Sequence, residues 1–292
     1  MLSFPLGARR RALLAAALVL VGSTAVQLSA ALASGVFAPL GTLAVSGYRM
    51  TAAALVLLVL TRPRLRGRTR SAWLGLVLYG AAMAAMNVLF YAALDRLPLG
   101  VAVTLEFCGP LAVAAVASAG RSRLLPALAL VGVLLVVGRP VGGLDLLGVL
   151  LGLGAAAAFG GYTALAGRVG SASSGLGDLA LSVAVGALLL APWQVVQASA
   201  VTPAQLPVLA LSGVLGVALA FSLDFQAVRL AGTRVVGTLF AVDPAMGAVV
   251  GAVLLGDRLP PSGLAGISVV VLAGAGAVWS SGRRPAPVLP PD

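Results

Sequence analysis

The sequence predicts an all-α integral membrane protein with ten transmembrane helices, arranged as two inverted five-helix repeats. Three observations support this fold class. The 292 residues are 60% hydrophobic and only 9% charged, whereas soluble domains are about 25% charged. Apolar runs long enough to cross a bilayer recur along the whole chain. A pattern in the first half of the chain also returns in the second half, 134 residues later.

The first observation, composition, also excludes several classes of protein. There is no histidine and one cysteine, Cys108. A single thiol cannot form an intrachain disulfide or a zinc site, and a Ser-His-Asp site needs a histidine. We therefore expect neither an enzyme nor a metal or cofactor site. The net charge of +11 comes entirely from arginine. These arginines are spread over short loops, which is typical of membrane proteins rather than of nucleic-acid-binding proteins.

The second observation, the apolar runs, predicts the helices in order. A span of about 20 apolar residues must be helical because its backbone groups can find partners only within the segment. The predicted spans are 12–33, 39–60, 72–92, 99–118, 122–139, 145–167, 177–197, 205–226, 234–255 and 262–280. The first span follows three arginines and resembles a signal peptide, but its apolar run is too long for one, so we keep it as a helix.

Arginine placement predicts the orientation. With the N-terminus in the cytoplasm, most loop arginines fall on the inside and only Arg96, Arg139 and Arg258 on the outside. This positive-inside bias predicts a multi-pass protein of the bacterial cytoplasmic membrane with both termini in the cytoplasm. We expect a first repeat at 1–142, a second at 143–284, and a disordered cytoplasmic tail at 285–292.

The third observation, the repeat, pairs the spans 99–118 and 234–255. Thr104 and Pro110 of the first span correspond to Thr238 and Pro244 of the second. Because five is odd, the second unit enters the membrane with the opposite orientation, as in many secondary transporters. The alternative is a duplicated scaffold with no transport function. Each proline removes a helical hydrogen bond, which predicts either a helix break at a substrate site or a packing kink.

Four ionisable residues lie within the predicted spans: Arg49, Glu106, Asp224 and Asp243. Such residues are costly in a membrane and usually pair, face a cavity or carry function. Glu106 and Asp243 are candidates for proton coupling or for binding a substrate amine, although Glu106 could instead pair with Arg49. Asp224 suits either a gate or an ion pair with a nearby arginine. Arg49 suits either a substrate carboxylate or the neutralisation of an acid.

Uncharged polar residues extend the candidate site. Asn87 can bond either a substrate or a neighbouring helix, and Tyr91 is a further polar group within an apolar span. We expect the remaining acids of the loops to be solvated; they are Asp95, Asp145, Asp178 and Asp257.

Two segments resemble a known family. The run PLGVAVTLEFCGPLAVA at 98–114 resembles that of the bacterial inner-membrane threonine/homoserine exporters, and GTRVVGTLFAVDPAMGAVVGAVLLGDRL at 232–259 is similar to their ninth helix. The second run also resembles the EamA-type drug/metabolite transporter superfamily, whose usual Leu-Gly-Glu is Leu-Gly-Asp here. The run SLDFQAVRL at 222–230 is similar to the exporter pattern, with Asp224 where a glutamate is more typical.

The resemblance implies a function as well as a fold. It implies proton-coupled efflux of small amino acids or related metabolites by alternating access, with a small-molecule substrate, protons and the lipid bilayer as partners. Glu106, Pro110, Asp224, Asp243 and Pro244 fall on matching motif positions. The rival functions are a multidrug or other metabolite exporter of the same fold, an intramembrane enzyme and a scaffold. The sequence predicts neither the substrate nor the oligomeric state.

Overall fold

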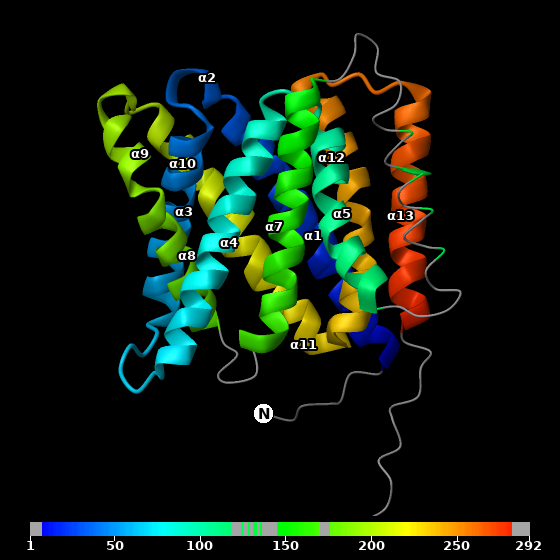
Figure 1. The fold of residues 1–292 in the computed structure, drawn as a ribbon, viewed down its shortest axis with the longest axis horizontal. Helices are drawn as coiled ribbons and strands as arrows, with labels where there is room; N and C mark the ends of the chain where they lie inside the picture. The colour runs from blue at the N-terminus through cyan, green and yellow to red at the C-terminus, as the bar shows by residue number, and fades with distance from the viewer. Residues whose placement is uncertain are drawn as a thin grey trace, which may run out of the picture.

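The computed structural model describes residues 8–117, 145–169 and 176–281, together with a few helical positions between 124 and 135. Within these residues every regular element is helical. Figure 1 shows the long helices standing side by side in one bundle, with the start of α1 and the end of α13 both at the lower end. Several of these helices are long and apolar enough to cross a bilayer.

The first half follows the prediction closely. Its elements are α1 (Ala8–Ser34), α2 (Phe37–Leu40), α3 (Thr42–Thr61), α4 (Arg70–Leu94) and α5 (Leu99–Ala117). One predicted span, 39–60, is divided between α2 and α3 at Gly41, whose φ of 74° lies outside the helical region. Glycine adopts this conformation without a steric penalty. The predicted span 122–139 lies mostly outside the described residues.

The second half contains more irregular helix. Its elements are α7 (Leu146–Val169), α8 (Leu176–Leu189), α9 (Ala191–Val196), the 3-10 turn η2 (Ala198–Ala200), α10 (Gln205–Gly213), the π-helix η3 (Val214–Leu219), α11 (Ala220–Leu239), the 3-10 turn η4 (Phe240–Val242), α12 (Asp243–Val250), the π-helix η5 (Gly251–Leu255) and α13 (Pro261–Ser281). The predicted span 177–197 is divided between α8 and α9 near Pro192, which lies in the first turn of α9.

The predicted loop between the spans 205–226 and 234–255 is instead helical, as part of α11. From 220 to 236 the sequence has no proline and a single glycine, Gly232, so little in this segment opposes helical hydrogen bonding. Figure 1 shows α11 at the lower end of the bundle, between the chain that descends from α10 and the chain that rises into α12.

Glycines allow the helices to approach closely. A side chain at Gly109 of α5 would overlap the carbonyl oxygen of Ala156 in α7, and one at Gly160 would lie 3.1 Å from the Gly109 carbonyl oxygen. On the same helix, Gly152 packs against Leu105 of α5. Small residues at such contacts let helix backbones meet without a side chain between them.

Helices α5 and α12 cross in an antiparallel register. A Cβ atom built at Gly247 would lie 2.9 Å from Val103, and one at Gly251 would lie 3.2 Å from Leu99. Residue numbers therefore rise along α5 while they fall along α12. These are the two helices that carry the repeated motif of the sequence.

Two of the four loop acids, Asp145 and Asp257, cap helices, whereas Asp178 pairs with Arg68 and Asp95 is exposed. Asp257 accepts a hydrogen bond from the backbone N–H of Leu99 at 2.8 Å, which caps the start of α5 from a distant segment. Asp145 accepts bonds of 2.8 and 3.2 Å from N–H groups in the first turn of α7. It also pairs with Arg96 at 2.8 Å, and this guanidinium holds the pKa of Asp145 below its usual range. Free N–H groups at helix N-termini explain both roles.

Replacement of Gly109 by alanine is expected to destabilise the fold by about 1–3 kcal/mol, because the new methyl group meets the Ala156 carbonyl. The matched control is Gly161→Ala on α7, where the new methyl group meets nothing within 4 Å. The thermal unfolding midpoint in detergent measures both. Equal midpoints for the two variants would show that the close contact between α5 and α7 is not required for stability.

Candidate functional site

Arg49 of α3 lies inside the bundle, with 3% of its surface exposed. Its Nε donates to Ser212 Oγ at 3.1 Å, and its Nη1 donates to Asn87 Oδ1 at 3.5 Å. Its Nη2 donates to Ser29 Oγ in a short bond and to the Ser212 carbonyl at 3.4 Å. Its guanidinium carbon lies 4.4 Å from the centre of the Tyr91 ring, a cation–π geometry. Four helices, α1, α3, α4 and α10, thus converge on one side chain.

The Arg49 partners are all neutral. Within the described parts of the chain, ion pairs join Arg68 to Asp178 at 2.6 Å and Arg96 to Asp145 at 2.8 Å, and neither involves Arg49. The alternative of an Arg49–Glu106 ion pair is therefore not what the structure contains. A buried cation without a counter-ion is costly, since hydrogen bonds replace only part of its hydration. Arg49 is thus a ready partner for an anion.

Two glycines make room for Arg49. A side chain at Gly213 would overlap the Arg49 carbonyl oxygen, and one at Gly216 would overlap Ser29 Oγ and lie 2.7 Å from Arg49 Nη2. Gly216 belongs to the π-helix η3. Short π-helical segments often occur at functional sites.

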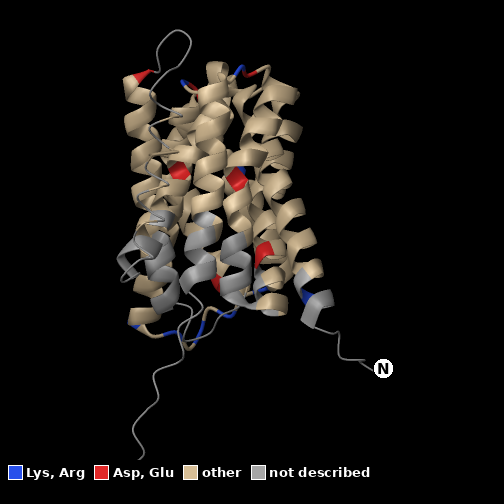
Figure 2. Cartoon of the chain, turned by 90° about the vertical axis from the view of Figure 1, so that its right-hand side faces the viewer, with Lys and Arg blue, Asp and Glu red and all other residues tan. Residues whose placement is uncertain are grey.

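A second group of residues gathers acids from three helices. The antiparallel register of α5 and α12 places Glu106 of α5 opposite Asp243 of α12, one helical turn beyond the contact of Val103 with Gly247. The two carboxyl groups interact electrostatically. Asp224 of α11 also interacts with Asp243. Glu106 and both aspartates are partly buried, and Figure 2 shows acidic residues within the body of the bundle as well as at its ends.

The acid group faces α1. Asp224 Oδ1 lies 3.1 Å from the position of a Cβ atom at Gly22. Ser23 Oγ and Asp243 Oδ1 are buried and have no hydrogen-bond partner. Asp224 Oδ1 also lacks a partner. Buried polar atoms are nearly always hydrogen-bonded, so these atoms mark a place where another polar group belongs.

Polar residues of α1 are the part of the site that the sequence reading missed. Ser23, Gln27 and Ser29 are 5%, 2% and 0% exposed. Ser29 donates to the Ser212 carbonyl at 2.6 Å, whereas Ser23 Oγ and Gln27 Oε1 have no partner. Together with Thr24 they make four polar residues in a predicted span that is otherwise apolar, but uncharged residues carry too small an insertion cost to stand out.

The predicted site residues thus fall into two groups. Arg49, Asn87 and Tyr91 lie together in the first, and the three acids lie together in the second. Asn87 also donates to the Met83 carbonyl of its own helix at 3.0 Å, so its bond with Arg49 is the one that joins it to a neighbouring helix. No group of histidine, cysteine, aspartate and glutamate in the described residues is arranged to hold a metal ion.

The two prolines differ in their effect. Helix α5 stays α-helical through Pro110. Pro244 lies in the first turn of α12, directly after the 3-10 turn η4. Only Pro244 therefore accompanies a change of helix type, because an inserted 3-10 turn shifts the hydrogen bonds that the proline cannot make.

Comparison with known proteins identifies relatives. A model of the EamA-like transporter family matches residues 146–279. The threonine/homoserine exporter RhtA of Escherichia coli (strain K12) is 34% identical over 269 residues, which cover 89% of this chain and 90% of the relative. RhtA of Salmonella typhimurium (strain SL1344) is 32% identical over 276 residues, covering 91% and 92%.

The fold also resembles one seen in a crystal. A protein of known crystal structure superposes with a TM-score of 0.59 at 19% identity, over 94% of this chain and 97% of its own. At that identity the likeness establishes a shared fold and nothing about activity.

Replacement of Arg49 by lysine is expected to destabilise the protein by about 1–3 kcal/mol, because an ammonium cannot reach Ser29, Ser212 and Asn87 at once and leaves buried polar atoms unpaired. The control is Arg96→Lys, whose ion pair is largely exposed and should change the unfolding midpoint little. A midpoint for Arg49→Lys equal to that of the control would show that the buried hydrogen bonds do not stabilise the fold.

Proposed function

The chain belongs to the EamA-like transporter family, and we propose that it exports small amino acids of the threonine/homoserine kind, or related metabolites, across the bacterial inner membrane. The observation that carries this proposal is the buried Arg49, whose described partners are all neutral. It lies in the same bundle as three partly buried acids. An α-amino acid carries both opposite charges, so one substrate can complement both groups.

Substrate recognition follows from the two groups. The substrate carboxylate binds at Arg49, whose five N–H donors exceed the hydrogen bonds that it makes to protein acceptors. The substrate ammonium turns toward Glu106 and Asp243. Charge-assisted hydrogen bonds of this kind are stronger than neutral ones. Asn87 and Tyr91 hold the guanidinium in place beneath the substrate.

Transport proceeds by alternating access between two inverted five-helix repeats. The antiparallel crossing of α5 and α12 supports this architecture, because counterpart helices of an inverted repeat run in opposite directions. The family match to residues 146–279 also supports it, since that segment corresponds to one repeat, 143–284, and leaves 1–142 as the other. Pro110 lies on the first helix of this pair and Pro244 on the second. In this proposal, residues 285–292 follow the second repeat as a tail on the cytoplasmic side.

Protons drive export through the acids. A carboxyl group holds either a proton or the substrate ammonium, so the two compete at Glu106. Proton entry from outside then promotes outward release of the substrate, and loss of the proton to the cytoplasm resets the carrier. Asp243 shares this role through its interaction with Glu106. Asp224 belongs to α11, which lies at the lower end of the bundle (Figure 1), and serves the cytoplasmic gate. Arg229, the nearby arginine with which it could pair instead, has a side chain outside the described residues.

A multidrug or other metabolite exporter is the closest alternative. The low content of aromatic residues, 5% of the chain, favours small polar substrates over flat aromatic ones. An intramembrane enzyme would consume a substrate without moving it. A scaffold would bind no substrate. Each alternative predicts a different result in a reconstituted system.

The experiment is efflux from proteoliposomes loaded with a panel of labelled amino acids, with and without a pH gradient. The wild-type protein should export threonine or homoserine, faster with the gradient. Glu106→Gln should abolish the stimulation by the gradient, because the amide cannot carry the proton. Substrate exchange without a gradient should persist at a lower rate, since Arg49 and Asp243 still bind the substrate.

The control for Glu106→Gln is Asp178→Asn, an acid that pairs with Arg68 outside the two groups and should leave gradient-driven efflux intact. Gradient-driven efflux that survives in Glu106→Gln would remove Glu106 from the coupling mechanism. Failure of the wild-type protein to move any amino acid would refute the proposed substrate class.

Topology provides an independent prediction. Both termini should lie in the cytoplasm, because arginine-rich loops gather there and an even number of spans returns the chain to its starting side. A C-terminal fusion to alkaline phosphatase should be inactive, whereas a fusion after Pro98 should be active. An active C-terminal fusion would place the two ends on opposite faces and exclude the inverted repeat.

A further inference from the structure

Gln27 of α1 is a buried amide whose oxygen has no hydrogen-bond partner. Its side chain is 2% exposed, and Oε1 is without a donor in the described structure. Ser23 Oγ and one oxygen each of Asp224 and Asp243 are likewise buried without a partner. Other buried polar residues are satisfied by the protein. Ser29 donates to Ser212, Asn87 donates to Met83, and Thr104 donates to the Gly100 carbonyl at 2.6 Å. Among the described residues, Gln27 Oε1 is the only amide oxygen that is buried without a partner, whereas buried polar atoms are nearly always hydrogen-bonded.

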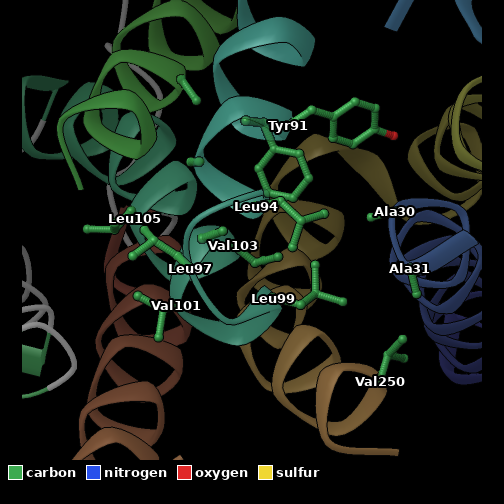
Figure 3. Close-up of a cluster of buried hydrophobic side chains, with 14 of the residues drawn as sticks. Ala30, Ala31, Tyr91, Leu94, Leu97, Leu99, Val101, Val103, Leu105 and Val250 are labelled. Carbon is green, nitrogen blue, oxygen red and sulfur yellow. The ribbon is translucent and has the colours of Figure 1, made fainter. Parts of the chain in front are cut away.

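Gln27 lies between the two groups of the proposed site. Ser23, one helical turn before it and on the same face of α1, has a buried hydroxyl without a hydrogen-bond partner. The adjacent Gly22 lies against Asp224, whose Oδ1 is 3.1 Å from a Cβ atom built there. Ala30, nearly one turn after it on that face, belongs to the apolar cluster that contains Tyr91 (Figure 3). The Tyr91 ring in turn holds Arg49. Along the axis of α1, the Gln27 amide therefore lies between the three acids and Arg49.

We infer that Gln27 selects substrates with a hydroxyl group on the side chain, by accepting a hydrogen bond from that hydroxyl at Oε1. This inference rests on the proposed function, which places the substrate carboxylate at Arg49 and its ammonium toward the acids. A substrate that bridges Arg49 and the acids therefore has its side chain at the same height along α1 as Gln27.

The chemistry discriminates against apolar substrates. Threonine and homoserine supply an O–H donor that satisfies the amide oxygen. Valine and 2-aminobutyrate are close in size but have no donor, so their binding leaves Oε1 buried and unpaired. Sites built to hydrogen-bond a substrate hydroxyl reject analogues that lack it far more strongly than apolar pockets distinguish shapes.

The test is the ratio of threonine to valine efflux from proteoliposomes. The wild-type protein should favour threonine, and Gln27→Leu should lower the ratio about tenfold or more by removing the acceptor. Gln27→Glu keeps an acceptor oxygen and should retain a preference for threonine. The matched control is Gln197→Leu, the same chemical change at the end of α9, at a residue that belongs to neither group.

The outcomes separate this inference from the proposed function. An unchanged ratio in Gln27→Leu, or a wild-type protein that moves both amino acids equally, would overturn the inference alone. A wild-type protein that moves no amino acid would overturn the proposed function and the inference together. If Gln27→Leu does not accumulate in the membrane, Gln27→Met offers an apolar side chain of similar length and flexibility, and an unchanged ratio in that variant would overturn the inference equally.

Discussion

A cation buried in an apolar bundle has to be matched by polar groups there, and the structure around Arg49 depends on this constraint. The hydrogen bonds to Ser29, Asn87 and Ser212 tie three other helices to α3. They also hold the guanidinium in a fixed orientation while leaving its charge without a counter-ion. A carrier benefits from this arrangement, because a site already neutralised by a protein carboxylate would gain little from binding a substrate anion.

Glycine makes the arrangement sterically possible. The backbone of η3 can approach Arg49 and Ser29 only because Gly213 and Gly216 have no side chain. Similar contacts bring α5 against α7 at Gly109 and against α12 at Gly247. In a membrane, where lipid is as apolar as the helices, such close backbone contact contributes to helix association in place of the hydrophobic effect. The same residues therefore stabilise the bundle and shape its polar interior.

The acids show how one residue type serves two purposes in this fold. Asp145 and Asp257 lie at the ends of helices, where free backbone N–H groups donate hydrogen bonds to their carboxylates. Asp224 and Asp243 lie deeper, and each has a buried oxygen without a hydrogen-bond partner. The first pair fixes where α5 and α7 begin. The second pair leaves bonding capacity open, which is the property that a binding or proton-carrying group needs.

The sequence by itself determined most of the described helices and the charged residues of the site. Apolar runs, proline and arginine placement act locally, so the helix positions followed from composition, and the cost of a buried charge made Arg49 and Glu106 conspicuous. Only the tertiary structure decided which neutral atoms meet. Ser29 and Ser212 are 183 residues apart yet share a hydrogen bond. Serine and glutamine in an apolar run do not by themselves indicate a binding site. The role inferred for Gln27 follows from its missing hydrogen-bond partner, which only the packing of distant helices reveals.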